Sequence, residues 1–228
     1  MLSPQLSIVI PVRNEIVLLG EMLEHYRDLA SCPAQVELLF VDGESRDGSH
    51  EYLQDRGFRV LSSTPGRARQ MNAGAAAAKG KMLLFLHADT VLPEAAIPAL
   101  LNIARSSTLW GRFDVIVEGT GVMFSIIGAM MNLRSRLSGV ATGDMGMFVR
   151  RELFLQLGGF PDLPLMEDIA LSKILRRQAR PYCLKPPLTT SGRRWQQRGI
   201  WRTIFLMWRL RFYYFIGVSP ARLAEWYR

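Results

Sequence analysis

Short apolar runs alternate with polar segments along the N-terminal third of the chain. Residues 6–11 (LSIVIP), 36–41 (VELLFV) and 58–62 are apolar, β-rich runs. Between the first two, residues 16–30 carry apolar side chains at helical spacing, and another helix is expected to begin near Ser49. Strands that alternate with helices predict a parallel, doubly wound sheet.

Residues 66–90 continue this pattern with a polar loop, an alanine-rich helix and a fourth strand. Residues 82–86 (MLLFL) form an unbroken apolar run, which is typical of a strand buried on both faces. The run ends at His87 and Asp89, and open α/β sheets bind ligands at the carboxyl ends of their strands. A carboxylate there suits Mg²⁺ or Mn²⁺ bridging to a diphosphate. An aspartate that starts the next helix is the alternative, and this segment alone leaves both open.

Polar side chains follow three of the predicted strands. They are Asn14 and Glu15, then Asp42 and Asp47, then His87 and Asp89. Because the carboxyl ends of parallel strands meet at one edge of a sheet, these side chains are expected to share one crevice.

Six polar or glycine-containing motifs occur in order between residues 8 and 195. They are IVIPVRNE (8–15), VDGESRDGS (41–49), GRARQMNAGAAAAKGKMLLFLHADT (66–90), GDMGMFVRRELFLQLGGF (143–160), MEDIALSKIL (166–175) and SGRRW (191–195). No single motif is specific, but the ordered set resembles the family 2 glycosyltransferases, inverting enzymes with a GT-A fold. The resemblance implies an α/β protein with a mostly parallel, Rossmann-like sheet flanked by helices. It also implies sugar transfer from a UDP- or GDP-linked donor to an acceptor hydroxyl.

The resemblance also implies roles for particular residues. Asp168 would be the general base and Glu167 would orient it or the acceptor. Without the resemblance, the two acids are more typical of a helix N-terminus, where the helix dipole favours them. Asp144 would lie near the acceptor or serve as a turn residue. Arg67 and Arg194 are expected to neutralise phosphate charge, because guanidinium groups match phosphate geometry. Residues expected to bind the donor nucleotide are Pro11, Asn14, Glu15, Asp42, Asp47, Arg67, Asn72 and Arg194.

The metal motif departs from the family's usual Asp-x-Asp. The chain has His87-Ala88-Asp89, so one carboxylate is missing, and in this it resembles a subgroup of small bacterial enzymes. Asp89 and His87 are the implied ligands of Mg²⁺ or Mn²⁺, although His87 is equally suited to hydrogen-bond the ribose or a nearby loop. The alternative function is a degenerate nucleotide-binding protein without transferase activity. The first strand is not followed by Gly-x-Gly-x-x-Gly, which argues against a dinucleotide enzyme.

Composition indicates a folded enzyme rather than a disordered or secreted chain. With 228 residues, 49% of them hydrophobic, the chain is long enough to bury a full core. Cys32 and Cys183 are too few for a disulfide framework, and no basic segment with an apolar run opens the sequence. A reducing, cytoplasmic location is therefore expected.

Positive charge is concentrated at the C-terminus. The whole chain carries +8, and residues 193–228 hold eight arginines, one acid and ten of the 22 aromatic residues, for a net charge of +7. We expect residues 1–195 to form the transferase domain and residues 196–228 an amphipathic helical tail. Helical spacing predicts one apolar stripe on this tail, formed by Trp201, Ile204, Phe205, Trp208, Phe212 and Phe215.

The partner of this stripe is left open by the sequence. Nucleic acid is disfavoured, because bases stack on separate exposed rings rather than on a continuous stripe. Arg209 and Arg211 would each cost about 2.5–3.5 kcal/mol at a membrane centre, which disfavours a span. The remaining partners are the cytoplasmic face of the inner membrane, where a lipid-linked acceptor would be presented, and the protein's own core or a second subunit. Residues 121–131 are too short to span and belong either to the core or beside the tail at the lipid.

Overall fold

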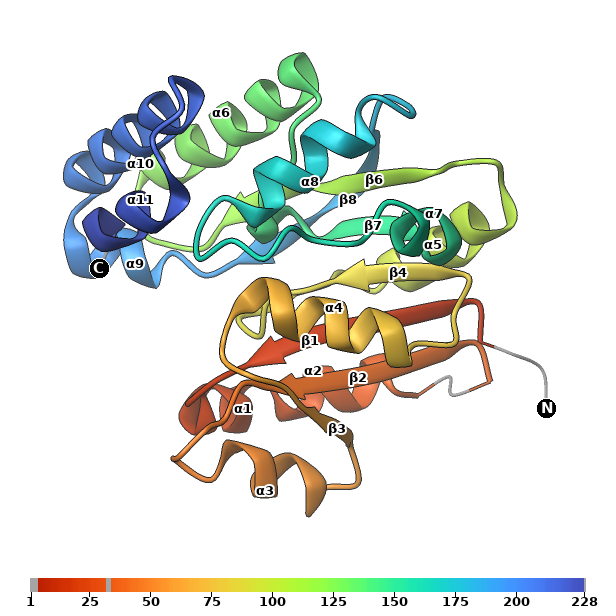
Figure 1. Ribbon diagram of the computed structural model, residues 1–228. Helices are drawn as coiled ribbons and strands as arrows, with labels where there is room; N and C mark the ends of the chain where they lie inside the picture. The colour runs from red at the N-terminus through yellow and green to blue at the C-terminus, as the bar shows by residue number, and fades with distance from the viewer. Residues whose placement is uncertain (1–3, 32–33, 228) are drawn as a thin grey trace.

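A computed structural model describes residues 4–31 and 34–227, so Cys32 lies outside the described residues. The chain forms an eight-stranded sheet in the order β3-β2-β1-β4-β7-β6-β8-β5 (Figure 1). The strands are β1 (Leu6–Val12), β2 (Val36–Asp42), β3 (Arg59–Ser62), β4 (Met82–Phe85), β5 (Thr90–Val91), β6 (Trp110–Val117), β7 (Met147–Arg150) and β8 (Tyr182–Thr190).

Helices cover both faces of the sheet. One face carries α1 (Ile16–Glu21), α2 (Leu23–Leu29), α5 (Ala96–Arg105) and α6 (Val122–Ser138), with α3 (Ser49–Gln54) at the β3 edge. The other face carries α4 (Arg67–Ala77), α7 (Arg151–Gln156) and α8 (Glu167–Leu175). The C-terminal helices are α9 (Arg193–Arg198), α10 (Ile200–Phe215) and α11 (Pro220–Tyr227), so α9 crosses the predicted boundary at residues 195/196.

The N-terminal half of the sheet confirms the predicted parallel topology. β1 pairs in parallel with both β2 and β4, and β2 pairs in parallel with β3. The other half is mixed, because β7 runs antiparallel to β4 and β6, and β5 runs antiparallel to β8. The predicted α/β sheet, flanked by helices and followed by a helical tail, is confirmed.

Two predicted helices differ in extent from the expectation. The helix expected over residues 16–30 is two helices, which meet at Met22 with ψ near 0°. The spacing missed this break because Leu19 and Tyr26 are both fully buried, and burial of one face does not require a continuous backbone. The apolar stretch 121–131 is the first part of α6, which continues to Ser138.

The start of α4 is held close to the sheet. A Cβ atom at Gly74 would lie 2.4 Å from Cγ1 of Val9 in β1, so only glycine allows this approach. On the same helix, the side chain of Gln70 donates to the carbonyl oxygens of Val12 and Val41, each at 2.8 Å. These contacts fix Arg67, the first residue of α4, near the carboxyl ends of β1 and β2.

Candidate active site

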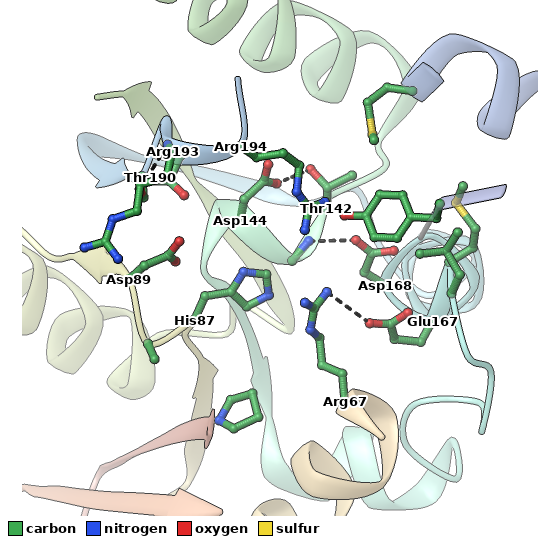
Figure 2. Close-up of a pocket in the computed structure, with 18 of the residues that line it drawn as sticks. Arg67, His87, Asp89, Thr142, Asp144, Glu167, Asp168, Thr190, Arg193 and Arg194 are labelled. Atoms are coloured by element: carbon green, nitrogen blue, oxygen red, sulfur yellow. Dashed lines mark hydrogen bonds and ion pairs between the residues drawn. The ribbon is translucent and has the colours of Figure 1, made fainter. Parts of the chain in front are cut away.

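A cavity of about 710 Å³ opens at the carboxyl ends of β1 and β4 (Figure 2). It receives side chains from the end of β1, the start of α4, the segment after β4, the start of α8 and the C-terminal helices. The predicted residues that line it are Pro11, Glu15, Arg67, His87, Asp89, Asp144, Glu167, Asp168 and Arg194. The fold thus brings nine of the thirteen candidate residues into one space.

Asp168 lies in the first turn of α8, held by two backbone N–H groups. The N–H of Gly143 donates to Oδ2 at 2.7 Å, and the N–H of Ile169 donates to Oδ1 at 2.6 Å. Burial, and then the neighbouring carboxylate of Glu167, raise the pKa of Asp168 to about 6. A carboxylate with this pKa is ionised at neutral pH and holds a proton better than an exposed aspartate, which suits a general base.

Glu167 faces an arginine across the cavity. Its side chain is buried, and Oε1 lies 3.7 Å from Nη1 of Arg67. The Arg67 side chain is 48% exposed, so its guanidinium is shared between this acid and the open cavity. The arrangement leaves Arg67 able to meet an anion while Glu167 holds it in place (Figure 2).

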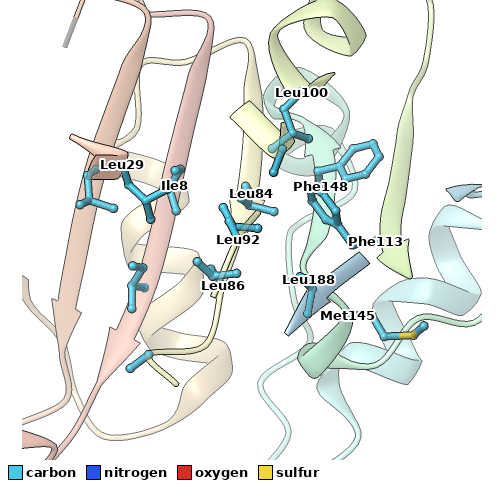
Figure 3. Close-up of a cluster of buried hydrophobic side chains, with 14 of the residues drawn as sticks. Ile8, Leu29, Leu84, Leu86, Leu92, Leu100, Phe113, Met145, Phe148 and Leu188 are labelled. Atoms are coloured by element: carbon cyan, nitrogen blue, oxygen red, sulfur yellow. The ribbon is translucent and has the colours of Figure 1, made fainter. Parts of the chain in front are cut away.

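His87 and Asp89 follow a strand fixed on both faces. Leu84 and Leu86 pack with Ile8 and Leu92 in the core beside them (Figure 3). Asp89 does not begin a helix: Thr90 starts β5, and α5 begins only at Ala96. The alternative interpretation of Asp89 as a helix-starting residue is therefore wrong.

His87 is half-buried, and its Nε2 atom is enclosed. Burial, and then the charges of Arg67 and Arg194, lower its pKa to about 3. Among the described residues its Nε2 has no hydrogen-bond partner. A Cβ atom at Gly143 would lie 2.6 Å from that Nε2, so the ring fits only because residue 143 has no side chain.

Asp89 lines the cavity close to other acids. Burial raises its pKa, and the negative charge of Asp144 adds to the effect, while Arg193 and Arg67 act against it. Glu15 behaves similarly, because burial and then the charge of Asp89 raise its pKa. A bound cation would relieve the repulsion among these three acids.

No preformed cage for a metal is found within residues 4–31 and 34–227: no three or more His, Cys, Asp or Glu side chains are arranged to hold an ion. Mg²⁺ nevertheless needs only one or two carboxylates when substrate phosphates complete its shell. Asp89 can supply one such ligand, and His87 lines the same cavity with its unpartnered Nε2 enclosed beside Gly143. The residues present therefore fit a divalent cation that arrives with a diphosphate.

Four predicted nucleotide-binding residues are absent from the described lining of the cavity, and they hold loops together instead. Asp47 accepts from the N–H groups of Ile16 and Ser49, each at 3.0 Å. Asn14 accepts from the N–H of Arg46 at 2.8 Å. Asn72 donates to the carbonyl oxygen of Phe160 and accepts from its N–H. Oδ2 of Asp42 accepts from the N–H of Ser45 and lies near Nδ1 of His50.

Asp42 keeps one oxygen without a partner. Its side chain is 6% exposed, and Oδ1 has no hydrogen bond among the described residues. A buried carboxylate oxygen without a donor is costly, so it is available to a ligand that reaches it.

The C-terminal helices form a wall of the cavity that the sequence did not reveal. Met207, Leu210 and Arg211 of α10 line it, as does Tyr227 at the end of α11. The Arg194 guanidinium lies 4.5 Å from the centre of the Tyr227 ring. The overlooked signal was the remainder of the α10 surface, with Leu210 opposite the aromatic stripe and Arg211 at its side.

Another part of the lining was also missed. Arg13 and Arg193 line the cavity. Thr142 lines it as well, donates to the carboxylate of Asp144 and lies 3.4 Å from Nη2 of Arg134. Burial lowers the pKa of Arg134, which the charges of Asp144 and Asp168 act to raise.

The chain matches the model of the family described as "Glycosyl transferase family 2" over residues 7–156. It is 31% identical over 160 residues to an undecaprenyl-phosphate 4-deoxy-4-formamido-L-arabinose transferase of Pseudomonas savastanoi pv. phaseolicola, covering 57% of this chain and 47% of the relative. It is 24% identical over 192 residues to the probable glycosyltransferase YdaM of Bacillus subtilis, covering 74% of this chain and 46% of that relative. The chain thus spans about half the length of these curated relatives.

Solved structures resemble the fold. A mannosyltransferase, PcManGT from Pyrobaculum calidifontis, in complex with GDP-Man and Mn²⁺, superposes with a TM-score of 0.65 at 19% identity, covering 98% of this chain and 69% of that one. Residues 1–349 of S. aureus TarS, in complex with UDP-GlcNAc, superpose with a TM-score of 0.66 at 19% identity, covering 82% and 58%. At this identity the likeness concerns the fold.

Proposed function

The chain belongs to glycosyl transferase family 2, and we propose that it transfers a sugar, with inversion, from a nucleoside-diphosphate sugar to an acceptor hydroxyl. The observation that carries the proposal is the cavity itself, in which a carboxylate of raised pKa, Asp168, shares one space with Arg67, Arg194 and Asp89. An inverting transfer needs a base for the acceptor and positive charge for the leaving diphosphate, and these residues offer both.

The diphosphate would lie between the start of α4 and the start of α9. Arg67 and Arg194 would neutralise its charge, because a guanidinium can bind two phosphate oxygens at once. Arg67 lies close enough to Arg194 for its charge to act there, since burial, and then the charge of Arg67, lower the pKa of Arg194. Like charges held together in this way favour an anion between them.

The nucleoside would lie beside the ends of β1 and β2. Pro11 and Glu15 line this part of the cavity, and the free Oδ1 of Asp42 lies at the end of β2. We assign base and ribose contacts to these three residues. Asn14, Asp47 and Asn72 would act as positioning residues, because their hydrogen bonds hold the surrounding loops. GDP-Man and UDP-GlcNAc are the ligands of the two similar structures, which supports a GDP- or UDP-linked donor.

Mg²⁺ or Mn²⁺ would be held by Asp89, with His87 as a second ligand. When bound, the ion would supply positive charge to the diphosphate oxygens. The support is the fit described above and the Mn²⁺ in the similar mannosyltransferase structure.

The chemical step would depend on Asp168. Its carboxylate would accept the proton of the acceptor hydroxyl while the acceptor oxygen bonds to the anomeric carbon. The bond from that carbon to the diphosphate oxygen would break, releasing the nucleoside diphosphate. Glu167 and the N–H of Gly143 would keep the base in position.

The acceptor is proposed to be lipid-linked and presented at the cytoplasmic face of the membrane. Support comes from the relative named as an undecaprenyl-phosphate transferase and from the basic, aromatic tail. In this proposal residues 1–195 are the transferase domain and residues 196–228 the tail that lines its acceptor side. The second candidate function, nucleotide binding without transfer, is favoured by His87 in place of an acid.

Calorimetry with UDP and GDP tests the donor proposal. Binding of one of the two nucleotides should weaken when EDTA is added and in the Asp89→Ala variant. The Asp168→Asn variant should still bind that nucleotide but should no longer hydrolyse the matching nucleotide sugar. Binding in the parent with no hydrolysis or transfer at all would favour the second candidate function. If neither nucleotide binds at any metal concentration, the transferase proposal fails.

A further inference from the structure

α10 carries a row of large aromatic side chains on its solvent side. Their exposed fractions range from 60% to 81%. The members of the row are Trp201, Phe205, Trp208, Phe212 and Phe215. At about 100° per residue, this spacing places all five within about 40° of one direction. Ile204, the sixth member of the predicted stripe, is half-buried.

The opposite side of α10 is seated on the protein. Thr203 is 1% exposed and Leu210 is fully buried. Leu210 packs with Met166 and Ile169 at the start of α8 and with Leu223 of α11. One face of α10 therefore packs on the core, as one of the two alternatives left open by the sequence has it, and the other face carries exposed aromatic rings.

Basic side chains border the aromatic row on both sides. At about 100° per residue, Arg202 and Arg209 lie on one flank and Arg211 on the other. α10 contains no acid. An apolar face flanked by arginines is the pattern of a helix that lies in a membrane interface, because long basic side chains reach the head groups.

α6 adds a second exposed apolar row. Its members, between 46% and 77% exposed, are Val122, Ile126, Met130, Leu133 and Leu137. The helix contains no acid, and Asn132 fixes it to β6 by accepting from the N–H of Val115 and donating to its carbonyl oxygen, at 2.9 and 3.0 Å. α6 and α10 lie at the same end of the molecule (Figure 1).

We propose that the exposed rows of α6 and α10 form a docking face that rests on the anionic leaflet of a lipid bilayer. A second copy of the same face is the less favourable partner, because it would bring two acid-free, arginine-bearing helices together. The described helices include none long and apolar enough to cross a bilayer. Anionic lipid supplies both an apolar layer and the negative charge that the flanks of α10 lack.

The docking face and the cavity share α10. Its aromatic row faces solvent, while Met207, Leu210 and Arg211 line the cavity that holds Asp168. A lipid-linked head group rising from the bilayer beside α10 would therefore reach the cavity along the same helix. This consequence rests on the proposed function, but the proposed docking to the bilayer does not.

Vesicle flotation tests the docking face without reference to activity. The parent should float with phosphatidylcholine–phosphatidylglycerol vesicles, and less in high salt, because charge near a surface is screened over about 8 Å at physiological ionic strength. Phe205→Ser with Trp208→Ser should lower partitioning at least about tenfold, since each ring loses its burial in lipid. Met130→Ser with Leu137→Ser should also lower it. Arg202→Gln with Arg209→Gln should lower binding only to the anionic vesicles.

Val17→Ser is the matched control, since Val17 is 72% exposed on α1, away from both rows. It should leave flotation unchanged, and all variants should show the circular dichroism spectrum of the parent. No flotation of the parent with anionic vesicles would overturn the proposal. So would a stable dimer, seen by light scattering without lipid, that dissociates in the Phe205/Trp208 variant, because the second copy would then be the partner. A variant of either row that loses flotation but still binds the nucleotide would support the docking face and would not bear on the proposed sugar transfer.

Discussion

Asp168→Asn is expected to inactivate the protein and at the same time make its fold more stable at alkaline pH. The pKa of the Asp168 carboxyl is raised from 3.8 to about 6, chiefly by burial and by Glu167. The folded chain therefore binds this proton more tightly than the unfolded chain. The associated stability is fully present below pH 3.8 and is lost as pH rises through 6.

The size of the effect follows from this shift. A shift of about two pKa units corresponds to about 3 kcal/mol of unfavourable free energy when Asp168 is ionised in the fold. Asparagine removes the charge but places one amide NH₂ beside a backbone donor, Gly143 or Ile169, which costs about 1 kcal/mol. The net gain at pH 8 is about 2 kcal/mol, or roughly 4–8 °C in Tm for a chain of this size.

Thermal unfolding at pH 4 and pH 8 measures this directly. The variant should be the more stable protein at pH 8, and the order should reverse near pH 4, where the parent carboxyl is also protonated. Asp55→Asn is the control, because Asp55 is an exposed aspartate that does not line the cavity. This change should alter the Tm little at either pH. Sugar transfer or donor hydrolysis should fall roughly 10²–10⁴-fold in Asp168→Asn, the usual range for a general base. A variant destabilised equally at both pH values would refute the burial argument, and unchanged turnover would remove Asp168 from the chemistry.

Three further changes probe the cavity and its supports. Asp89→Ala should abolish the part of UDP or GDP binding that EDTA removes, while metal-independent binding measured by calorimetry persists. Gly143→Ala should lower turnover more than nucleotide affinity, because the new Cβ would lie 2.6 Å from His87 Nε2 and displace the loop that holds the base; equal losses in both would contradict this. Asn72→Ala should lower the free energy of unfolding in urea by about 1–3 kcal/mol, since both backbone groups of Phe160 lose their partner.

The parallel half of the sheet was predictable because its signals are local. An apolar run such as residues 82–86 identifies a strand buried on both faces, and all four residues of β4 are at most 3% exposed. Two strands were not predicted: β7, which runs antiparallel to β4, and β8, which runs parallel to β6. Both pair with strands far away in the chain, and the residue pattern of a strand does not identify its partner.

The sequence could not show which acids face the cavity and which hold a loop, and the reason is chemical. A carboxylate accepts from a backbone N–H as readily as from a ligand, so Asp47 and Asp89 look alike in the motifs. In the fold, Asp47 accepts from the N–H groups of Ile16 and Ser49, whereas Asp89 lines the cavity. Only the positions of nearby donors separate a residue that holds a loop from one that faces the substrate.

The neighbours of the histidine in the acidic motif are compatible with the proposed transferase site. Arg67 and Arg194 both lie close enough to His87 to lower its pKa, and the ring fills the space left by Gly143. An aspartate at position 87 would pair with these two arginines and reduce the positive charge offered to a diphosphate. A neutral imidazole leaves that charge available while Asp89 keeps one carboxylate in the cavity. In the proposed function, histidine at this position would therefore shift the binding of the diphosphate from the metal ion toward the arginines. The hydrogen bond from the N–H of Gly143 to Asp168 does not involve His87.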